Sequence, residues 1–282
     1  RGYGQLGAGK LTLANDASGI INATDSTLVL RTSSMRNAGL LEAGGGTLVI
    51  ETTIDNTGGQ IVAAGSTVQL GGEGVAAIIS GGVLSRSGTG GFVVTAAATL
   101  KDLTSSGPVQ VSQGATLNLA GGIVDQGGIV VDGSSGYGAS TLRVSGPVSL
   151  SGGGTITLTD TYGSNMSGTA AAISGAAAGD ALDNIDNVIQ GYGQIGNNLA
   201  FTNEASGVVN ATASTLTIGA GSSTVVNRGR MIATGGALTV ATAVENSGVI
   251  EAKSGVVTLA GALTGSGTVR IDSGGTLQLN AT

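Results

Sequence analysis

Residues 39–50 read G-L-L-E-A-G-G-G-T-L-V-I, and close variants of this phrase recur along the chain. Residues 19–30 read G-I-I-N-A-T-D-S-T-L-V-L, and residues 207–218 read G-V-V-N-A-T-A-S-T-L-T-I. Each copy places the first apolar residue of its second run five positions after the alanine, as with Ala43 and Leu48. A fixed short segment between two apolar runs, repeated about every 20 residues, is typical of a solenoid of stacked coils.

The second apolar run of each phrase alternates with period two. Leu216 and Ile218 flank Thr217, which predicts a short strand with one buried face. A single strand of about 3–5 residues is not ordered alone in water, so the strands must pair between successive coils. Successive coils run in the same direction, and pairing is therefore parallel. We predict an all-β parallel solenoid with roughly 20 residues per coil and about 14 coils.

Glycine and asparagine occupy the positions where each coil must bend. Both residue types tolerate positive φ, which tight turns require. One asparagine recurs in register before glycine, and we expect its copies to form a single hydrogen-bonded turn ladder. The members of this predicted ladder are Asn37, Asn56, Asn227 and Asn246. A helical fold is disfavoured because glycine and β-branched residues are abundant and no 3.6-residue period is present.

The composition supports a large aliphatic core and excludes several functions. Hydrophobic residues make up 40% of the 282 residues and charged residues only 10%, which is the opposite of a disordered chain. Cysteine and histidine are absent, so disulfides, thiolate zinc sites and a Ser-His-Asp triad are excluded. The net charge is −6 with scattered basic residues, and no apolar run reaches about 20 residues. We expect no nucleic-acid binding and no membrane insertion.

A second, longer repeat contains the first. G-Y-G-Q-L-G at 2–7 returns as G-Y-G-Q-I-G at 191–196, an offset of 189 residues, and the residues that follow also return. Residues 1–190 therefore form one full unit and 191–282 the first half of the next, within one continuous solenoid. Because the chain starts at Arg1, we expect it to be a piece of a longer protein.

The phrase is looser between the two matched regions, over about 71–189. The least regular stretch is 160–186, which we expect to leave the coil pattern as an excursion or loop. Residues 180–189 read D-A-L-D-N-I-D-N-V-I, and this pattern is compatible with a helical turn or with a strand.

These phrases resemble the passenger repeats of large Gram-negative surface adhesins of the autotransporter, haemagglutinin-like and type I-secreted kinds. The likeness lies in N-x-G-x-I-x-A…T-L-x-L and the G-Y-G-Q-I-G lead-in and covers most of the chain. The resemblance implies a right-handed parallel β-helix, display on the bacterial cell surface or in the extracellular space, and a role in adhesion, biofilm or a fibrous coat. A glycan or another molecule of a host surface is the receptor that it implies.

Acidic residues are sparse, and one group of them is close in sequence. Asp180, Asp183 and Asp186 are spaced by three, which suits a solvated loop or, as a weak candidate, a calcium site. The calcium-binding nonapeptide G-G-x-G-x-D is absent, because Val75 and Ala76 follow 71–74 where aspartate is needed. We expect no cofactor and no catalytic residues, although a polysaccharide-acting β-helix enzyme is a lesser alternative.

Threonine precedes the inward apolar residue of many coils and should face outward as one column. The column comprises Thr27, Thr47, Thr67, Thr99, Thr116, Thr155, Thr215 and Thr276. Ice-binding β-helices carry paired Thr-x-Thr on nearly every coil, and here only the coils of Thr155 and Thr215 are paired in this way. Ice binding is thus a minor alternative.

The patterns together favour a non-catalytic structural or adhesive rod. Its partners would be adjacent repeats of the same protein or other copies placed end to end, together with a possible receptor. The main alternative is a subunit that assembles into extracellular β-solenoid filaments, because an uncapped solenoid exposes strand edges.

Overall fold

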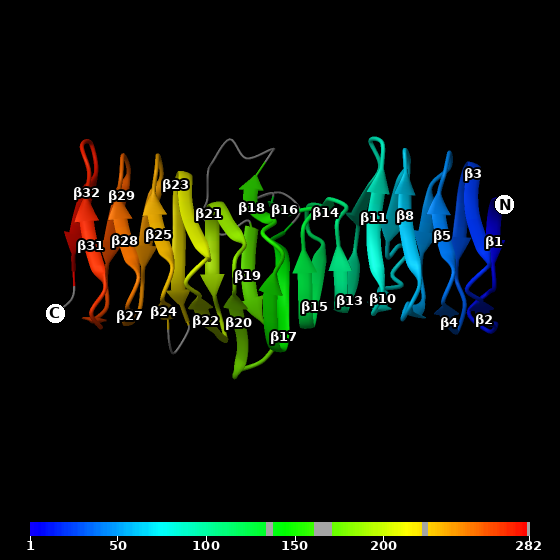
Figure 1. Ribbon diagram of the computed structural model, residues 1–282, viewed down its shortest axis with the longest axis horizontal. Helices are drawn as coiled ribbons and strands as arrows, with labels where there is room; N and C mark the ends of the chain where they lie inside the picture. The colour runs from blue at the N-terminus through cyan, green and yellow to red at the C-terminus, as the bar shows by residue number, and fades with distance from the viewer. Residues whose placement is uncertain (134–137, 161–170, 222–224, 281–282) are drawn as a thin grey trace.

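The computed structural model describes residues 1–133, 138–160, 171–221 and 225–280. The predicted fold class is confirmed: within these residues every regular element is a strand, and the strands stack in parallel as a solenoid of about 12 turns of about 21 residues. Figure 1 shows a rod with the N-terminus at one end and the C-terminus at the other. The two candidates left open for residues 180–189 resolve as strand, since Asp180–Asn184 form β20 and β21 begins at Val188.

Each turn places one strand on each of three faces, and the chain visits the faces in the same order throughout. Short strands stay on one face, whereas several longer strands turn a corner and contribute to two. The corner-turning strands are β3 (Ile20–Leu30), β13 (Ala97–Ser105), β15 (Thr116–Asp125), β17 (Ser140–Ser151), β21 (Val188–Gly196) and β23 (Val208–Ala220). Their pairing registers shift at the bend, as between Lys101 and Leu103 of β13.

Face 1 begins near the N-terminus and ends on the last strand. It comprises β2 (Thr12–Asn15), β4 (Ser34–Asn37), β7 (Thr53–Asp55), β10 (Ala77–Ser80), the first halves of β13, β15 and β17, then β19 (Ala171–Gly175), the second halves of β21 and β23, and β26 (Ala237–Val240), β29 (Val256–Leu259) and β32 (Thr276–Leu279).

Face 2 follows face 1 in every turn. It comprises the first half of β3, β5 (Leu40–Ala43), β8 (Gln60–Ala64), β11 (Val83–Ser87), the second halves of β13, β15 and β17, and β20, β22 (Leu199–Asn203), β24 (Val225–Asn227), β27 (Val244–Asn246) and β30 (Leu263–Thr264).

Face 3 completes the turn. It comprises β1 (Gly2–Leu6), the second half of β3, β6 (Leu48–Ile50), β9 (Thr67–Leu70), β12 (Gly91–Val94), β14 (Val109–Val111), β16 (Ile129–Gly133), β18 (Thr155–Asp160), the first halves of β21 and β23, and β25 (Arg230–Ala233), β28 (Val249–Ala252) and β31 (Thr268–Ile271).

Aliphatic side chains fill the interior as columns that run along the rod. On face 3 the column of Leu30, Ile50 and Leu70 is completely buried, and each residue is paired with the next through the strand register. The alternate residues Val29 and Gln69 are partly exposed, which is the period-two pattern of a half-buried strand, whereas Val49 of β6 is buried. Burial of this continuous column drives the stacking, because no single coil encloses its own apolar side chains.

The number of coils is lower than the predicted 14, because the coils in the middle of the chain are longer. Near the N-terminus Leu41 pairs with Ile61, a step of 20 residues, whereas Leu142 of β17 pairs with Ile173 of β19, a step of 31. The added residues lie between β18 and β19. The expectation that all of 160–186 leaves the coil pattern is wrong for its later part, because β19 and β20 pair within faces 1 and 2. Residues 161–170 of that stretch are outside the described part of the chain.

The two units of the long repeat are rotated against each other by one face. Asn15 ends β2 on face 1, and its equivalent, Asn203, ends β22 on face 2. Face 1 runs from β2 through β4, β7, β10, β13, β15, β17 and β19 to β21, and β22 is the next strand after β21. One unit therefore spans eight turns and one further face. The boundary between residues 190 and 191 lies inside β21, so the solenoid passes through it without interruption.

Candidate functional site

Two ladders of buried asparagine side chains run parallel to the axis. In the first, Nδ2 of Asn15 donates to Oδ1 of Asn37 at 2.7 Å, and Nδ2 of Asn37 donates to Oδ1 of Asn56 at 2.7 Å. Asn37 also donates to the backbone carbonyls of Gly39 and Gln60. Each amide thus satisfies both its neighbour in the ladder and the backbone at the bend, which a buried polar group requires.

The second ladder lies in the other half of the rod. Nδ2 of Asn184 donates to Asn203 at 2.9 Å, Asn203 donates to Asn227 at 2.9 Å, and Asn227 donates to Asn246 at 2.7 Å. The predicted asparagines do form hydrogen-bonded ladders, but two separate ones and not a single one. Asn37 and Asn56 stack along face 1, whereas Asn227 and Asn246 stack along face 2, because the phrase moves by one face between the two units.

The threonines do not form one column either, and they already divide between two faces within the first unit. Face 3 carries Thr27, Thr47, Thr67 and Thr155, and face 1 carries Thr99, Thr116, Thr215 and Thr276. On face 3 the row is broken where Gly91 pairs with Thr67. On face 1 Thr215 pairs with Ala237, and Thr276 pairs with Val256. The continuous flat threonine array of an ice-binding face is therefore not formed at these positions.

The three aspartates that are close in sequence have different environments. Asp180 accepts hydrogen bonds from the backbone N–H groups of Ala177 at 2.7 Å and Gly146 at 2.8 Å, and the bond from Ala177 is the main cause of its lowered pKa. Asp186 accepts from Gly152 at 2.8 Å, and Asp183 is exposed. Asp180 and Asp186 therefore fix the backbone at bends next to strands, which is a structural role.

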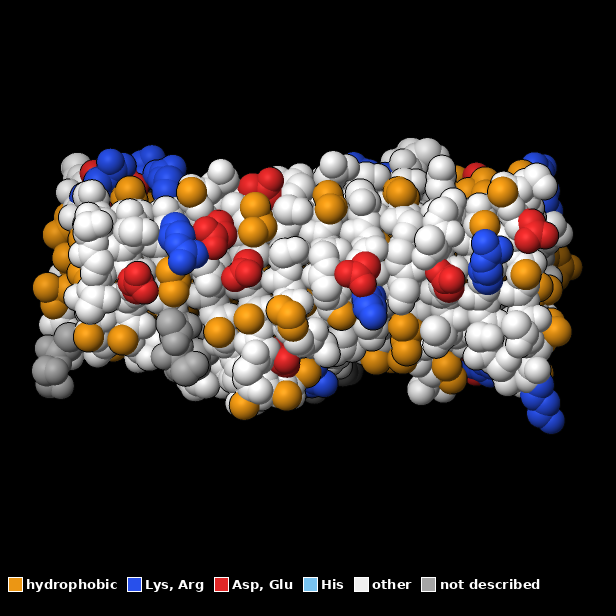
Figure 2. Space-filling view, turned by 60° about the horizontal axis from the view of Figure 1, so that its bottom comes forward, with side chains coloured by type: hydrophobic (Ala, Val, Ile, Leu, Met, Phe, Trp, Pro, Cys, Tyr) orange, Lys and Arg blue, Asp and Glu red, His pale blue; other side chains and the backbone are white. Residues whose placement is uncertain are grey.

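No group of three or more acidic side chains converges as a metal site in the part of the chain that the structure describes. Both carboxylate oxygens of Asp180 and the Oδ1 of Asp186 accept hydrogen bonds from backbone N–H groups. Figure 2 shows acidic and basic side chains dispersed along the visible side of the rod.

A buried carboxylate that sequence analysis did not single out is Asp125 at the end of β15. Its side chain accepts from the N–H of Gly128 at 2.9 Å, and Nδ2 of Asn187 lies 3.4 Å from its Oδ2. Desolvation raises the pKa of Asp125 to about 6, against the opposing effect of the backbone bonds. The signal was present in the sequence, because D-Q-G at 125–127 has the form of the N-x-G turn with aspartate in the asparagine position.

Ion pairs between successive coils form a further feature that sequence analysis missed. On face 3 Glu251 of β28 is almost fully buried and lies between Arg230 of β25 at 3.1 Å and Arg270 of β31 at 2.7 Å. The hydrogen bond from Arg270 is the main cause of the lowered pKa of Glu251. In the other half of the rod one arginine, Arg31, pairs with two glutamates that follow it in the chain, Glu51 and Glu73. Arg230 and Glu251 are separated by 21 residues and Glu251 and Arg270 by 19, which is about one coil, so the predicted repeat length could have suggested these pairs.

The two equivalent tyrosines differ. The hydroxyl of Tyr192 accepts from the N–H of Asp160 at 2.9 Å and lies 3.1 Å from the carbonyl oxygen of Asp160, to which it donates. Tyr3, the first-unit equivalent, is 70% exposed. The same residue type in the same phrase thus has a backbone partner at one position and a solvent-exposed ring at the other.

Comparison with known proteins gave no match to a family model, to a curated protein or to a solved structure. Within the described residues there is no helix with the length and apolar character needed to cross a membrane.

Proposed function

We propose that this chain is part of a non-catalytic structural rod whose 189-residue units are joined end to end. The observation that carries the proposal is the equivalence of the two unit starts. Gly2 pairs with Ala23 and Gly4 with Leu28, and their second-unit equivalents Gly191 and Gly193 pair with Ala211 and Leu216. The second unit begins with the same strand pairing as the first, and the apolar core continues through the boundary. Such units can follow one another without a break and so lengthen the solenoid.

The rod is further proposed to be displayed outside the cell, where it would carry an adhesive element or form part of a coat. This part rests on the resemblance of its phrases to surface adhesin repeats. It is supported by the amide ladders and ion pairs that link successive coils, because such links strengthen a rod along its axis. Antibodies raised against this segment should label intact cells as strongly as permeabilised ones. Labelling that requires permeabilisation would contradict external display.

The rod proposal itself is tested by length. Adding one further unit of 189 residues, inserted after residue 190, should lengthen the particle by about 40 Å, since eight and a third turns are added at about 4.8 Å each. Electron microscopy or small-angle scattering measures this directly. A particle that grows in width instead of length would contradict the proposal.

Assembly into filaments is a second candidate, because the strands of a parallel solenoid pair along its axis and can continue this pairing with a further copy. Exposed strand edges and apolar side chains promote pairing between chains. Rods of one fixed length at high protein concentration would count against filament formation, while concentration-dependent chains of rods would support it.

A further inference from the structure

The second asparagine ladder is interrupted inside the rod, at the corner between faces 2 and 3. Asn184 is its first member and donates to Asn203 at 2.9 Å, but Oδ1 of Asn184 is buried and has no hydrogen-bond partner among the described residues. Every later member accepts from the asparagine before it. The coil before Asn184 supplies no such donor, because Leu150 of β17, which pairs with Asn184, is followed by S-G-G-G at 151–154.

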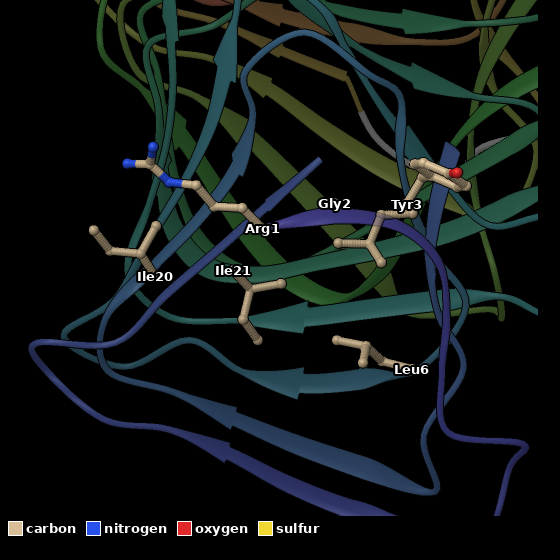
Figure 3. A pocket seen from close by; sticks show the side chains of 7 residues that line it. Arg1, Gly2, Tyr3, Leu6, Ile20 and Ile21 are labelled. Carbon is tan, nitrogen blue, oxygen red and sulfur yellow. The ribbon is translucent and has the colours of Figure 1, made fainter. Parts of the chain in front are cut away.

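Coils lie on both sides of this corner, so the solenoid itself closes it. Asp125 ends β15 on the coil before the bend at 151–154, and Asn184 ends β20 on the coil after it. Polar groups at the corner must therefore find their partners within the rod. The situation differs at the hollow in Figure 3, which lies at the first coil and is open on the side where a preceding coil would lie.

The glycines of the bend leave no room for a side chain next to Asp125. A Cβ atom at Gly154 would lie 2.5 Å from Oδ2 of Asp125, and one at Gly152 would lie 2.6 Å from the carbonyl oxygen of Asp125. The N–H of Gly154 donates to that carbonyl oxygen at 2.9 Å. A side chain that connects Asp125 with the ladder must therefore come from another coil.

Asn187 supplies this side chain from the following coil. It precedes Val188, whose N–H donates to the carbonyl oxygen of Gly154 at 3.0 Å, so Asn187 stacks on Gly154. Its amide reaches back over the glycine to the next coil, where Nδ2 lies 3.3 Å from the carbonyl oxygen and 3.4 Å from Oδ2 of Asp125. Its own backbone carbonyl accepts from Nδ2 of Asn184 at 2.9 Å. Asn187 thus contacts both Asp125 and the first member of the ladder.

The polar groups at this corner include more acceptors than donors. Oδ1 of Asn187, like that of Asn184, is buried without a hydrogen-bond partner among the described residues. The side chains of Asp125 and of both asparagines are completely buried, and the two bonds from Asn187 to Asp125 are long. Because a buried polar group without a partner is unfavourable, an arrangement that gives both amide oxygens a donor is stabilising.

Asp125 is the titratable group that can supply a further donor. Burial raises its pKa to about 6, against the opposing effect of hydrogen bonds from its own turn. The side chains next to it from β13 and from the following coil are Ser105 and Asn187, which do not ionise. The carboxylate that binds the bend at 151–154 is Asp186, which accepts from two N–H groups there at 2.8 and 3.1 Å. No ionised side chain is a cause of the pKa shift, so burial makes the Asp125 carboxyl neutral at mildly acidic pH.

We propose that a proton taken up by Asp125 joins the second ladder to β15. An ionised carboxylate only accepts hydrogen bonds and so holds Nδ2 of Asn187 toward itself, whereas a neutral carboxyl also donates. In the neutral state the amide of Asn187 turns over, its Oδ1 accepts from Asp125, and its Nδ2 donates to Oδ1 of Asn184. The turn exchanges two groups of similar size and gives both unpartnered oxygens a donor. The ladder then runs without a break from Asp125 to Asn246.

A substitution in the ladder distinguishes this switch from the simple burial of a carboxyl. Asn184→Leu removes the oxygen that gains a donor, so it should lower the melting temperature by about 2–4 °C more at pH 5 than at pH 7.5. Asn203→Leu is the matched control, because the oxygen of Asn203 has its donor already, and its effect should be the same at both pH values. In the Asp125→Asn background the effect of Asn184→Leu should no longer depend on pH. An equal effect of Asn184→Leu at both pH values in the unaltered background would overturn the proposal, even if Asp125 itself titrates near pH 6.

Neutron diffraction from the unaltered chain tests the same step without a variant, and therefore decides it even where Asn184→Leu fails to fold. At pH 5 deuterium should be found on the carboxyl of Asp125, and Nδ2 of Asn187 should face Asn184. At pH 8 Nδ2 should face Asp125. The same amide orientation at both pH values, or a water bound to Oδ1 of Asn184 at pH 5, would overturn the proposal. Neither measurement depends on the length of the rod or on where it is displayed, so the proposed function is tested separately.

Discussion

The amide Nδ2 of Asn203 lies 2.9 Å from Oδ1 of Asn227 on the following coil, and both side chains are completely buried. Asn203 also accepts a hydrogen bond from Asn184 and donates to the carbonyls of Gly207 and Arg230. One side chain thus connects three successive coils and satisfies the backbone at their bends. Because each partner is buried, a break in the ladder leaves polar groups without water to replace the lost bond.

Asn203→Ala should therefore destabilise the rod by about 2–4 kcal/mol, since more than one buried partner loses its hydrogen bond. The matched control is Asn246→Ala at the end of the ladder, where the side chain's own donor bonds are long, at 3.4 and 3.5 Å. Its cost should be smaller. Denaturant unfolding, with hydrogen exchange of β22 and β24 as a local measure, would detect the difference. Equal losses of stability would mean that an asparagine in the middle of the ladder contributes no more to folding than one at its end.

Asp125 should make the rod more stable at mildly acidic pH. Its pKa is raised in the folded state from 3.8 to about 6, so the neutral carboxyl favours folding. This contribution is complete below about pH 3.8 and is lost as the pH rises through about 6. Between pH 7 and pH 5 the protein should gain about 1 kcal/mol that the Asp125→Asn variant does not gain. Parallel melting curves of the two proteins at both pH values test this, and identical pH profiles would refute it.

The ion-paired glutamate should give a pH dependence of the opposite sign. The pKa of Glu251 is lowered from 4.5, mainly by the hydrogen bond from Arg270, so its contribution is present above pH 4.5 and is lost as the pH falls through the lowered value. Glu251→Gln should cost about 1 kcal/mol at pH 7, and less in 1 M salt because the arginines are half exposed. Glu204→Gln, which affects the more exposed pair with Arg228, is the control and should cost less.

The two glycines of the G-Y-G phrase provide a comparison in which backbone strain is matched. Gly193 and Gly4 both have positive φ, so alanine is strained at either position by about 1–2 kcal/mol. Gly193→Ala should cost at least about 2 kcal/mol more than Gly4→Ala, because only the former places Cβ 2.3 Å from a buried carbonyl oxygen. Thermal melts of the two variants measure the excess. Equal costs would mean that strain alone explains the glycine at both positions.

Much of the fold was predictable because the information is local and repeated. The alternation around Leu48 and Ile50 identifies an inward-facing strand, and the constant spacing from Ala43 identifies the bend before it. The candidate site was harder. Asn37 and Asn56 were predicted from their recurring N-x-G motif. Asp125 has aspartate in place of the asparagine of that motif and was therefore not singled out. Arg230, Glu251 and Arg270 lie on three successive strands of face 3, and their contacts depend on the side-chain geometry within that stack.

The sequence by itself determined that this chain winds as a parallel solenoid, because period-two strands at a fixed spacing have no other way to bury their apolar side chains. Only the tertiary structure decided which repeats stack on which. Each coil can hold extra residues at its corners without disturbing its strands, so the number of residues does not give the face on which a residue lies. One unit therefore spans eight turns and one further face. For this reason Asn37 and Asn227 lie on different faces of the rod although their sequence contexts are alike.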